Sequence, residues 1–171
     1  DDDGKMVTGW DTDSDGQQYY LCEDGSMGRH WVAIGDDWYV FDSSGHPISG
    51  WYFSGKYWYY LDGGKMLTSQ WIGDDYYVTA DGMMAKGFVE IDGVTHYFKN
   101  SGEMSSNWVD YNGTWYYFGP SGEMQTGWFT VDGDRYFADS QGEVQTGLIQ
   151  IDSINYQFDS DGLLVKTGAS G

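Results

Sequence analysis

A short phrase recurs about every twenty residues along this chain, and each copy begins with a large apolar residue. The fullest copy spans residues 108–128 and runs from Trp108 through the pair Asn112-Gly113 to an aromatic stretch at residues 115–118. So short a period indicates a repeat architecture, because one small unit cannot bury its apolar face alone. Any binding chemistry is then copied along the chain. The copies begin at Trp10, Trp31, Trp51, Trp71, Phe88, Trp108, Trp128 and Leu148.

Each copy holds two short β-prone runs with a turn between them. A pair such as Asn-Gly or Asp-Gly in that position favours a type I′ hairpin, because both central residues of that turn need positive φ. A lone hairpin is marginal in water. The sequence therefore predicts an all-β fold, a solenoid of about eight stacked β-hairpins of ~20 residues each. The turn pairs are Asp15-Gly16, Ser54-Gly55, Asp92-Gly93, Asn112-Gly113 and Asp132-Gly133.

The repeat continues along the chain without a linker or a shift in composition. We therefore expect a single repeat domain over residues 1–168, followed by a tail at residues 169–171. Residues 1–10 resemble the end of a preceding repeat, which predicts that the chain is a fragment of a longer protein. Aromatic residues make up 19% of the chain, so we expect rings, and not one broad aliphatic core, to fill the space between repeats.

The formal net charge of −19 narrows the range of partners. It argues against nucleic acid, because binding phosphate requires Lys and Arg, and it favours a cationic ligand. No apolar run reaches membrane-spanning length, so we expect no membrane insertion. Cys22 is the only cysteine, which excludes an internal disulfide and a thiol-rich metal site. We expect no cofactor.

One acidic segment resembles the start of a calcium-binding loop. Asp11, Asp13 and Asp15 stand at the first, third and fifth positions and Gly16 at the sixth. The twelfth position holds Cys22 in place of a bidentate Glu, so this is a weak calcium candidate beside the alternative of a solvated acidic turn. The three histidines lack ligand spacing, and nothing builds a cleft for paired catalytic carboxylates. The sequence predicts a binding module and not an enzyme.

The most informative position is the residue before the tyrosines of the second run. The residue at this position differs between copies, so it is not what holds the fold together. Tryptophan at this position therefore predicts a ligand site. The next slot is aromatic in every copy, which is typical of a stacking element. The variable slot holds Gln18, Trp38, Trp58, Asp75, Thr95, Trp115, Arg135 and Asn155.

The phrase Gly-Trp, Asn-Gly-x-Trp-Tyr-Tyr-Phe, Gly-x-Met-x-Thr-Gly-Trp resembles the choline-binding repeats of Gram-positive surface proteins, most closely at residues 51–71 and 108–128. The resemblance implies a left-handed β-solenoid in a secreted, cell-wall-associated protein. It also implies binding of choline or phosphocholine of teichoic acid in aromatic cages between hairpins, and dimers through terminal hairpins. A quaternary ammonium cannot donate a hydrogen bond, so ring faces suit it through cation–π attraction.

In that family a cage takes the first Trp and the second-run Trp of one hairpin and a Tyr of the next. The resemblance places Met66 beside the second of the sets below and Met124 beside the third. Arg135 would repel a cation, so we expect its interface to be structural only. The complete sets are Trp31, Trp38 and Tyr59; Trp51, Trp58 and Tyr76; and Trp108, Trp115 and Tyr136.

Two alternatives remain open. Residues 88–104 and 128–144 resemble, less closely, the glucan-binding repeats of glucansucrases and the repeats of large clostridial toxins, which implies an α-glucan-binding module. The chain could also be a structural stalk with vestigial sites, because only three copies carry a complete ring set. Two tryptophans in one hairpin favour a cage around a cation.

Overall fold

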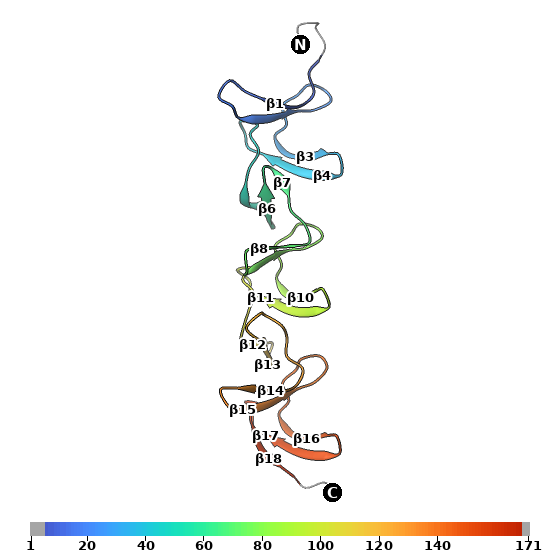
Figure 1. Ribbon diagram of the computed structural model, residues 1–171, viewed down its shortest axis with the longest axis vertical. Helices are drawn as coiled ribbons and strands as arrows, with labels where there is room; N and C mark the ends of the chain where they lie inside the picture. The colour runs from blue at the N-terminus through green and yellow to red at the C-terminus, as the bar shows by residue number, and fades with distance from the viewer. Residues whose placement is uncertain (1–5, 169–171) are drawn as a thin grey trace. The chain divides into compact units, whose positions relative to one another are not determined.

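The computed structural model describes residues 6–168, which form β-hairpins joined by tight connectors (Figure 1). The predicted all-β solenoid of stacked hairpins, about eight in number, is confirmed, whereas its left-handed sense stays a prediction. Within residues 6–168 no helix is long and apolar enough to cross a membrane. Residues 1–5 and the expected tail at residues 169–171 lie outside the described residues.

Contacts divide the chain into two compact units, Asp1–Ala85 and Lys86–Gly171, here called unit 1 and unit 2. The single domain expected over residues 1–168 stays a prediction. The hairpins of unit 1 are β1–β2 (Gly9–Thr12, Gln18–Leu21), β3–β4 (His30–Ile34, Asp37–Phe41), β5–β6 (Gly50–Phe53, Trp58–Asp62) and β8–β9 (Gln70–Ile72, Tyr76–Val78). Those of unit 2 are β10–β11 (Gly87–Ile91, Val94–Phe98), β12–β13 (Trp108–Tyr111, Thr114–Tyr117), β14–β15 (Gly127–Val131, Asp134–Ala138) and β16–β17 (Gly147–Ile151, Ile154–Phe158).

Two further strands belong to connectors. The short strand β7 (Lys65–Met66) pairs with both β4 and β6, and thereby joins two hairpins into one five-stranded sheet. At the end of unit 2, β18 (Leu164–Thr167) adds to β17. Connector backbone therefore hydrogen-bonds to the hairpins and does not merely link them.

The type I′ prediction is confirmed in unit 2 and wrong at two turns of unit 1. At Asn112-Gly113 both φ angles are positive, 56° and 84°, and Asp92-Gly93 and Asp132-Gly133 behave alike. Asp15 and Ser54 have no positive φ, because extra residues separate the strands there. The loops close instead through backbone hydrogen bonds between residues farther apart in sequence, such as the one that the Asp13 N–H donates to the Gln17 carbonyl at 2.9 Å.

In seven of the eight hairpins within residues 6–168 the core contains the side chain at or next to the end of the second strand, whereas Leu21 of the first hairpin is half-buried. These seven side chains are at most 1% exposed, because each lies under the connector that follows it. Phe118, for example, is bridged to Met124 of the next connector. Within each unit the hairpins thus share a column of buried side chains and do not each build a separate core. The column comprises Phe41, Leu61 and Val78 in unit 1, and Phe98, Phe118, Ala138 and Phe158 in unit 2.

The glycine that recurs in every connector has a packing role. A Cβ on Gly82 would lie 2.5 Å from Sδ of Met66, and a Cβ on Gly142 would lie 2.5 Å from Sδ of Met124. Both glycines also have positive φ, 75° and 82°, which favours glycine. The apolar residue of one connector therefore packs on the glycine of the next, which explains why these two residue types recur together.

His96 leads us to expect that the stability of unit 2 depends on pH. It stands in the aromatic slot of β11, is 7% exposed, and burial lowers its pKa below the ordinary value of 6.5. The stability tied to its neutral form is thus present above pH 6.5 and is lost as pH falls towards the folded-state pKa. We expect the thermal midpoint to drop between pH 7.5 and pH 5.5, and the His96→Phe variant to lose much of that drop.

The exposed His30 supplies the matched control, since His30→Asn keeps a residue that tolerates its positive φ of 57°. The backbone N–H of His46 lowers the pKa of Asp42, so this carboxylate becomes protonated only below about pH 4. Its titration therefore lies outside the range from pH 7.5 to pH 5.5. A midpoint with the same pH profile in wild type and His96→Phe would contradict the assignment.

Candidate functional site

In both units, the first aromatic ring of one hairpin packs edge-on against a tyrosine of the next hairpin. This is the arrangement that the three ring sets require, and it brings rings from separate copies together. The ring centroids lie 5.1 Å apart for Trp31 and Tyr59, 5.4 Å for Trp51 and Tyr76, and 4.8 Å for Trp108 and Tyr136. The interplanar angles are 75°, 63° and 68°.

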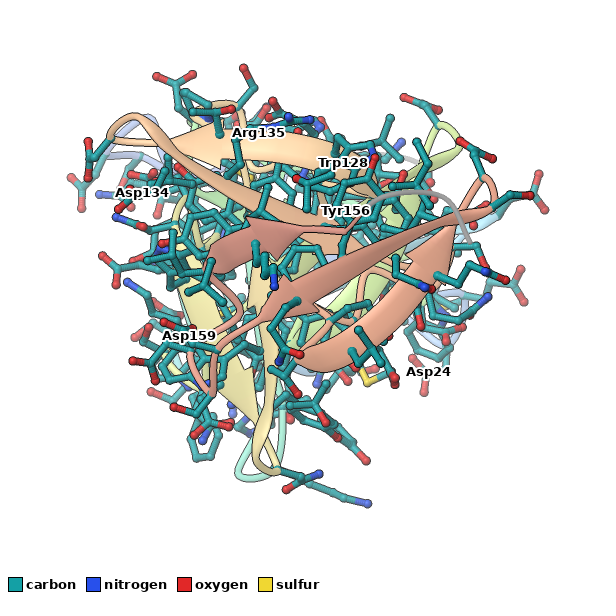
Figure 2. The ribbon with its side chains drawn as sticks, turned by 90° about the horizontal axis from the view of Figure 1, so that it is seen from below. Asp24, Trp128, Asp134, Arg135, Tyr156 and Asp159 are labelled. Atoms are coloured by element: carbon teal, nitrogen blue, oxygen red, sulfur yellow. The ribbon has the colours of Figure 1, made fainter. Side chains whose placement is uncertain are left out.

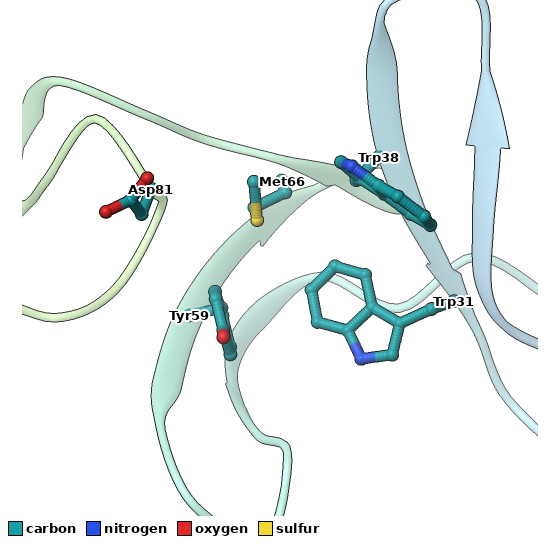
Figure 3. Close-up of a pocket in the computed structure, with 5 residues that line it drawn as sticks. All are labelled: Trp31, Trp38, Tyr59, Met66 and Asp81. Atoms are coloured by element: carbon teal, nitrogen blue, oxygen red, sulfur yellow. The ribbon is translucent and has the colours of Figure 1, made fainter.

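The first set lines a cavity of about 320 Å³ in unit 1 (Figure 3). Trp31 pairs with Val40 across the hairpin and Trp38 with Ala33, so both indoles lie on one face. Their centroids are 6.3 Å apart at 79°, and Tyr59 contacts Trp31 from the next hairpin. Trp38 is 49% exposed, which is unusual for so large an apolar ring. We call this pocket cage A; it is lined by Trp31, Trp38, Tyr59, Met66 and Asp81.

Unit 2 repeats this geometry around the third set. Trp108 and Trp115 lie 6.2 Å apart at 85°, and Tyr136 closes the side against Trp108. Burial raises the pKa of Tyr136, so its phenol stays neutral at physiological pH. The Trp115 carbonyl accepts a hydrogen bond of 2.9 Å from the Val144 N–H of a later connector. We call this cavity of about 300 Å³ cage B; it is lined by Trp108, Trp115, Tyr136 and Asp161.

The middle set is arranged differently. Trp51 contacts Tyr76 as expected, but the ring of Trp58 packs on Phe53 at 5.1 Å and 38°. Phe53 is the residue directly opposite Trp58, whereas Trp38 faces Ala33 and Trp115 faces Asp110. A large apolar cross-strand partner therefore holds the second tryptophan here, and a small or polar partner leaves it free to line a cage.

The methionines lie one repeat away from where the resemblance put them. Met66 lines cage A and not the Trp51 set, and Met124 packs on the buried cluster around Phe118 and is not among the residues lining cage B. The reason is the path of the connectors, which return to the previous hairpin. In cage B the position that corresponds to Met66 is Val144, whose backbone is bonded to Trp115.

Each cage also contains a carboxylate that the sequence analysis missed. Asp81 and Asp161 both precede a connector glycine, two hairpins beyond the paired tryptophans. Only three of the eight connector glycines follow an acidic residue, the third being Gly25 after Asp24. An acidic residue at this spacing from a Trp pair is therefore the signal that could have found them.

These two carboxylates differ from the structural aspartates of the connectors. Asp139, for example, accepts backbone hydrogen bonds from the N–H groups of residues 141 and 143. Asp24 accepts one hydrogen bond from the backbone N–H of Ser26 and one from its hydroxyl. Across the described part of the chain, no hydrogen bond or ion pair engages the side-chain oxygens of Asp81 or Asp161. Their charge is left available to the cages.

The acidic segment at Asp11, Asp13 and Asp15 is used as a turn. Asp13 accepts N–H hydrogen bonds from Asp15 and Gln17, both at 2.9 Å, and its other oxygen meets His46 at 3.2 Å. The backbone hydrogen bond from Gln17 is the largest cause of the lowered pKa of Asp13. Within residues 6–168 no group of three or more His, Cys, Asp or Glu side chains is arranged to hold a metal ion, so the structure does not support the calcium hypothesis.

Comparisons with known families match three stretches of the chain. A model described as choline-binding repeat matches residues 106–144, which include the Trp108, Trp115 and Tyr136 rings of cage B. A model described as putative cell wall binding repeat matches residues 8–27 and 86–104. A search of curated protein sequences found no match.

Solved structures resemble the chain over nearly its whole length. CbpJ from Streptococcus pneumoniae is 26% identical, with 94% of this chain and 66% of CbpJ covered and a TM-score of 0.83. Choline binding protein F from Streptococcus pneumoniae, solved with a peptidoglycan analogue, is 30% identical, with 94% and 58% covered and a TM-score of 0.77. The choline-binding domain of CbpL from Streptococcus pneumoniae is 26% identical, with 93% and 87% covered and a TM-score of 0.75. The chain thus spans 58–66% of the length of the first two.

Proposed function

The chain carries choline-binding repeats, and from that premise we propose that it is a non-catalytic cell-wall-binding module whose cages A and B hold the choline groups of teichoic acid. The supporting observation is the same three-ring geometry in two separate units, with each second tryptophan exposed to solvent. The module would act in a secreted protein attached to the wall, and any catalytic part would lie elsewhere in the full-length protein.

The chemistry of the cages suits a quaternary ammonium. Such a cation cannot donate hydrogen bonds, so polar walls give it none, and it is held by ring faces, an apolar contact and nearby negative charge. Each ring contributes about 0.5–2 kcal/mol, depending on desolvation, so a single cage binds weakly. Two cages acting on one polymer then raise the apparent affinity without any new contact.

The carboxylates strengthen this proposal. Asp81 and Asp161 place a negative charge at each cage, and the chain as a whole carries a net charge of −19. Oppositely charged groups at short range attract, and the field of the whole chain steers a cation towards it. Phosphocholine carries its own anion, so we expect its ammonium end to enter the cage and its phosphate to stay in solvent.

The shape of the cages favours choline over α-glucan. Sugar rings stack flat on an aromatic platform, with polar neighbours that bind the hydroxyls. In cage A the two indoles stand at 79° and in cage B at 85°, so each pair forms a corner and not a platform. The corner surrounds a compact cation from two sides, and Tyr59 or Tyr136 adds the third.

Calorimetric titration with choline, beside an α-glucan oligosaccharide, tests the proposal. We expect saturable heat with choline, none with the sugar, and several-fold weaker binding in Asp81→Asn and Asp161→Asn because each loses a charge that faces the cation. Asp24→Asn is the matched control, since Asp24 also precedes a connector glycine but binds Ser26. Absence of choline binding in the wild type would overturn the proposal, and heat with the sugar alone would establish the glucan alternative.

A further inference from the structure

Arg135 stands where cages A and B have their second tryptophan. In β14–β15, Trp128 pairs with Phe137 and Thr130 with Arg135, so Trp128 and Arg135 are diagonal neighbours on one face. Trp108 and Trp115 are related in the same way in β12–β13. The Arg135 guanidinium carbon lies 4.5 Å from the centre of the Trp128 ring, a cation–π contact (Figure 2).

The contact between the first tryptophan and the tyrosine of the next hairpin is present at this position. Trp128 contacts Tyr156 of the next hairpin at 4.8 Å and 67°, which matches the 4.8 Å and 68° of Trp108 and Tyr136 in cage B. Whereas the contact between first tryptophan and tyrosine is the same, the second tryptophan of cage B has no aromatic counterpart at this position. In its place the chain supplies a cation.

The guanidinium could pair with a carboxylate instead of the indole ring, since the chain holds 27 Asp and Glu against 8 Lys and Arg. Asp134 and Asp132 lie beside it in sequence, yet none of the ion pairs among residues 6–168 involves Arg135. An exposed ion pair would contribute little in water. Contact with an indole face is at least as favourable and also covers apolar surface.

We propose that Trp128, Tyr156 and Arg135 form a third cage, the second in unit 2, which is filled by the protein's own cation. Arg135 holds the position of a ligand cation over Trp128, stabilises the hairpin β14–β15 through this contact and excludes an external quaternary ammonium. It thereby determines how many sites unit 2 offers. The statement about external ligands rests on the proposed function, whereas the internal contact does not.

A double-mutant cycle measures the internal contact without any ligand. Arg135→Gln, Trp128→Leu and the double variant are compared by urea denaturation, with Arg29→Gln as a control for loss of an exposed cation elsewhere. We expect Arg135 and Trp128 to be coupled by about twofold to fivefold in the unfolding equilibrium constant, the range that an exposed cation–π pair of 0.5–1 kcal/mol gives. Additive effects would overturn the proposal, whether or not the chain binds choline.

Arg135→Trp tests the exclusion of ligand. This substitution supplies the missing ring and removes the internal cation, so we expect the number of choline molecules bound at saturation to rise by one over the wild type. An unchanged number, in a folded variant whose cages A and B still bind, would overturn the exclusion and leave the proposed function intact. If the wild type binds no choline, the proposed function fails and the double-mutant cycle alone decides the role of Arg135.

Discussion

The double variant Trp38→Ala, Trp115→Ala is expected to lose retention on a choline-bearing polymer by about a hundredfold or more while keeping the wild-type unfolding transition. Each substitution removes one wall of a cage, which costs up to ~2 kcal/mol at that site. The two losses multiply because avidity needs both cages at once. Trp38 and Trp115 are 49% and 41% exposed, so truncating them leaves the buried column intact.

Each single variant should fall between the wild type and the double variant, which separates loss of avidity from loss of one site. Tyr57→Ala is the matched control, since Tyr57 is 40% exposed and lines neither cage. Retention is measured by elution with free choline, and folding by circular dichroism. Full retention of the double variant would contradict the assignment of the cages, and loss of its folded signal would show that the slot is structural.

Phe118→Ala should cause the largest loss of stability in unit 2, about 3–5 kcal/mol in the free energy of unfolding. Phe118 is 0% exposed and packs with Val109 and Tyr116, with Tyr97 and Met124 around them. Truncation leaves a cavity between two hairpins that cannot collapse, because the connectors above it are bonded to neighbouring repeats. Urea denaturation followed by circular dichroism measures the loss.

Leu148 provides the comparison within the same unit. It replaces the first tryptophan of its copy and is 70% exposed, so Leu148→Ala should change the free energy of unfolding by less than about 0.5 kcal/mol. If the two variants were equally stable, burial under the connectors would not be what holds the hairpins together.

The sequence was sufficient to predict the hairpins, because turn pairs such as Asn112-Gly113 fix strand ends by local geometry. The family resemblance predicted which rings of the first and third sets lie together, as in the contact of Trp108 with Tyr136. The same local reasoning failed at Asp15 and Ser54, where the number of residues between the strands, and not the pair itself, sets the turn.

What could not be predicted depends on contacts between separate copies. Met66 and Asp81 reach cage A because the connectors return to earlier hairpins. The repeat length of the sequence shows how far apart equivalent residues are, but it does not show to which hairpin a connector returns. The different arrangement of Trp58 depends on the side chain opposite it, Phe53, which lies outside the repeated phrase. Even so, the varying slot before the tyrosines correctly marked where the copies differ.

The connector path has a consequence for how such chains can change. Cage A draws on residues from Trp31 to Asp81 and cage B on residues from Trp108 to Asp161, so each spans three consecutive hairpins although the sequence repeats every one. Duplicating or deleting a single copy would therefore alter cages whose own tryptophans lie up to two copies away. The segment that repeats in the sequence and the segment that forms a cage are different lengths of chain.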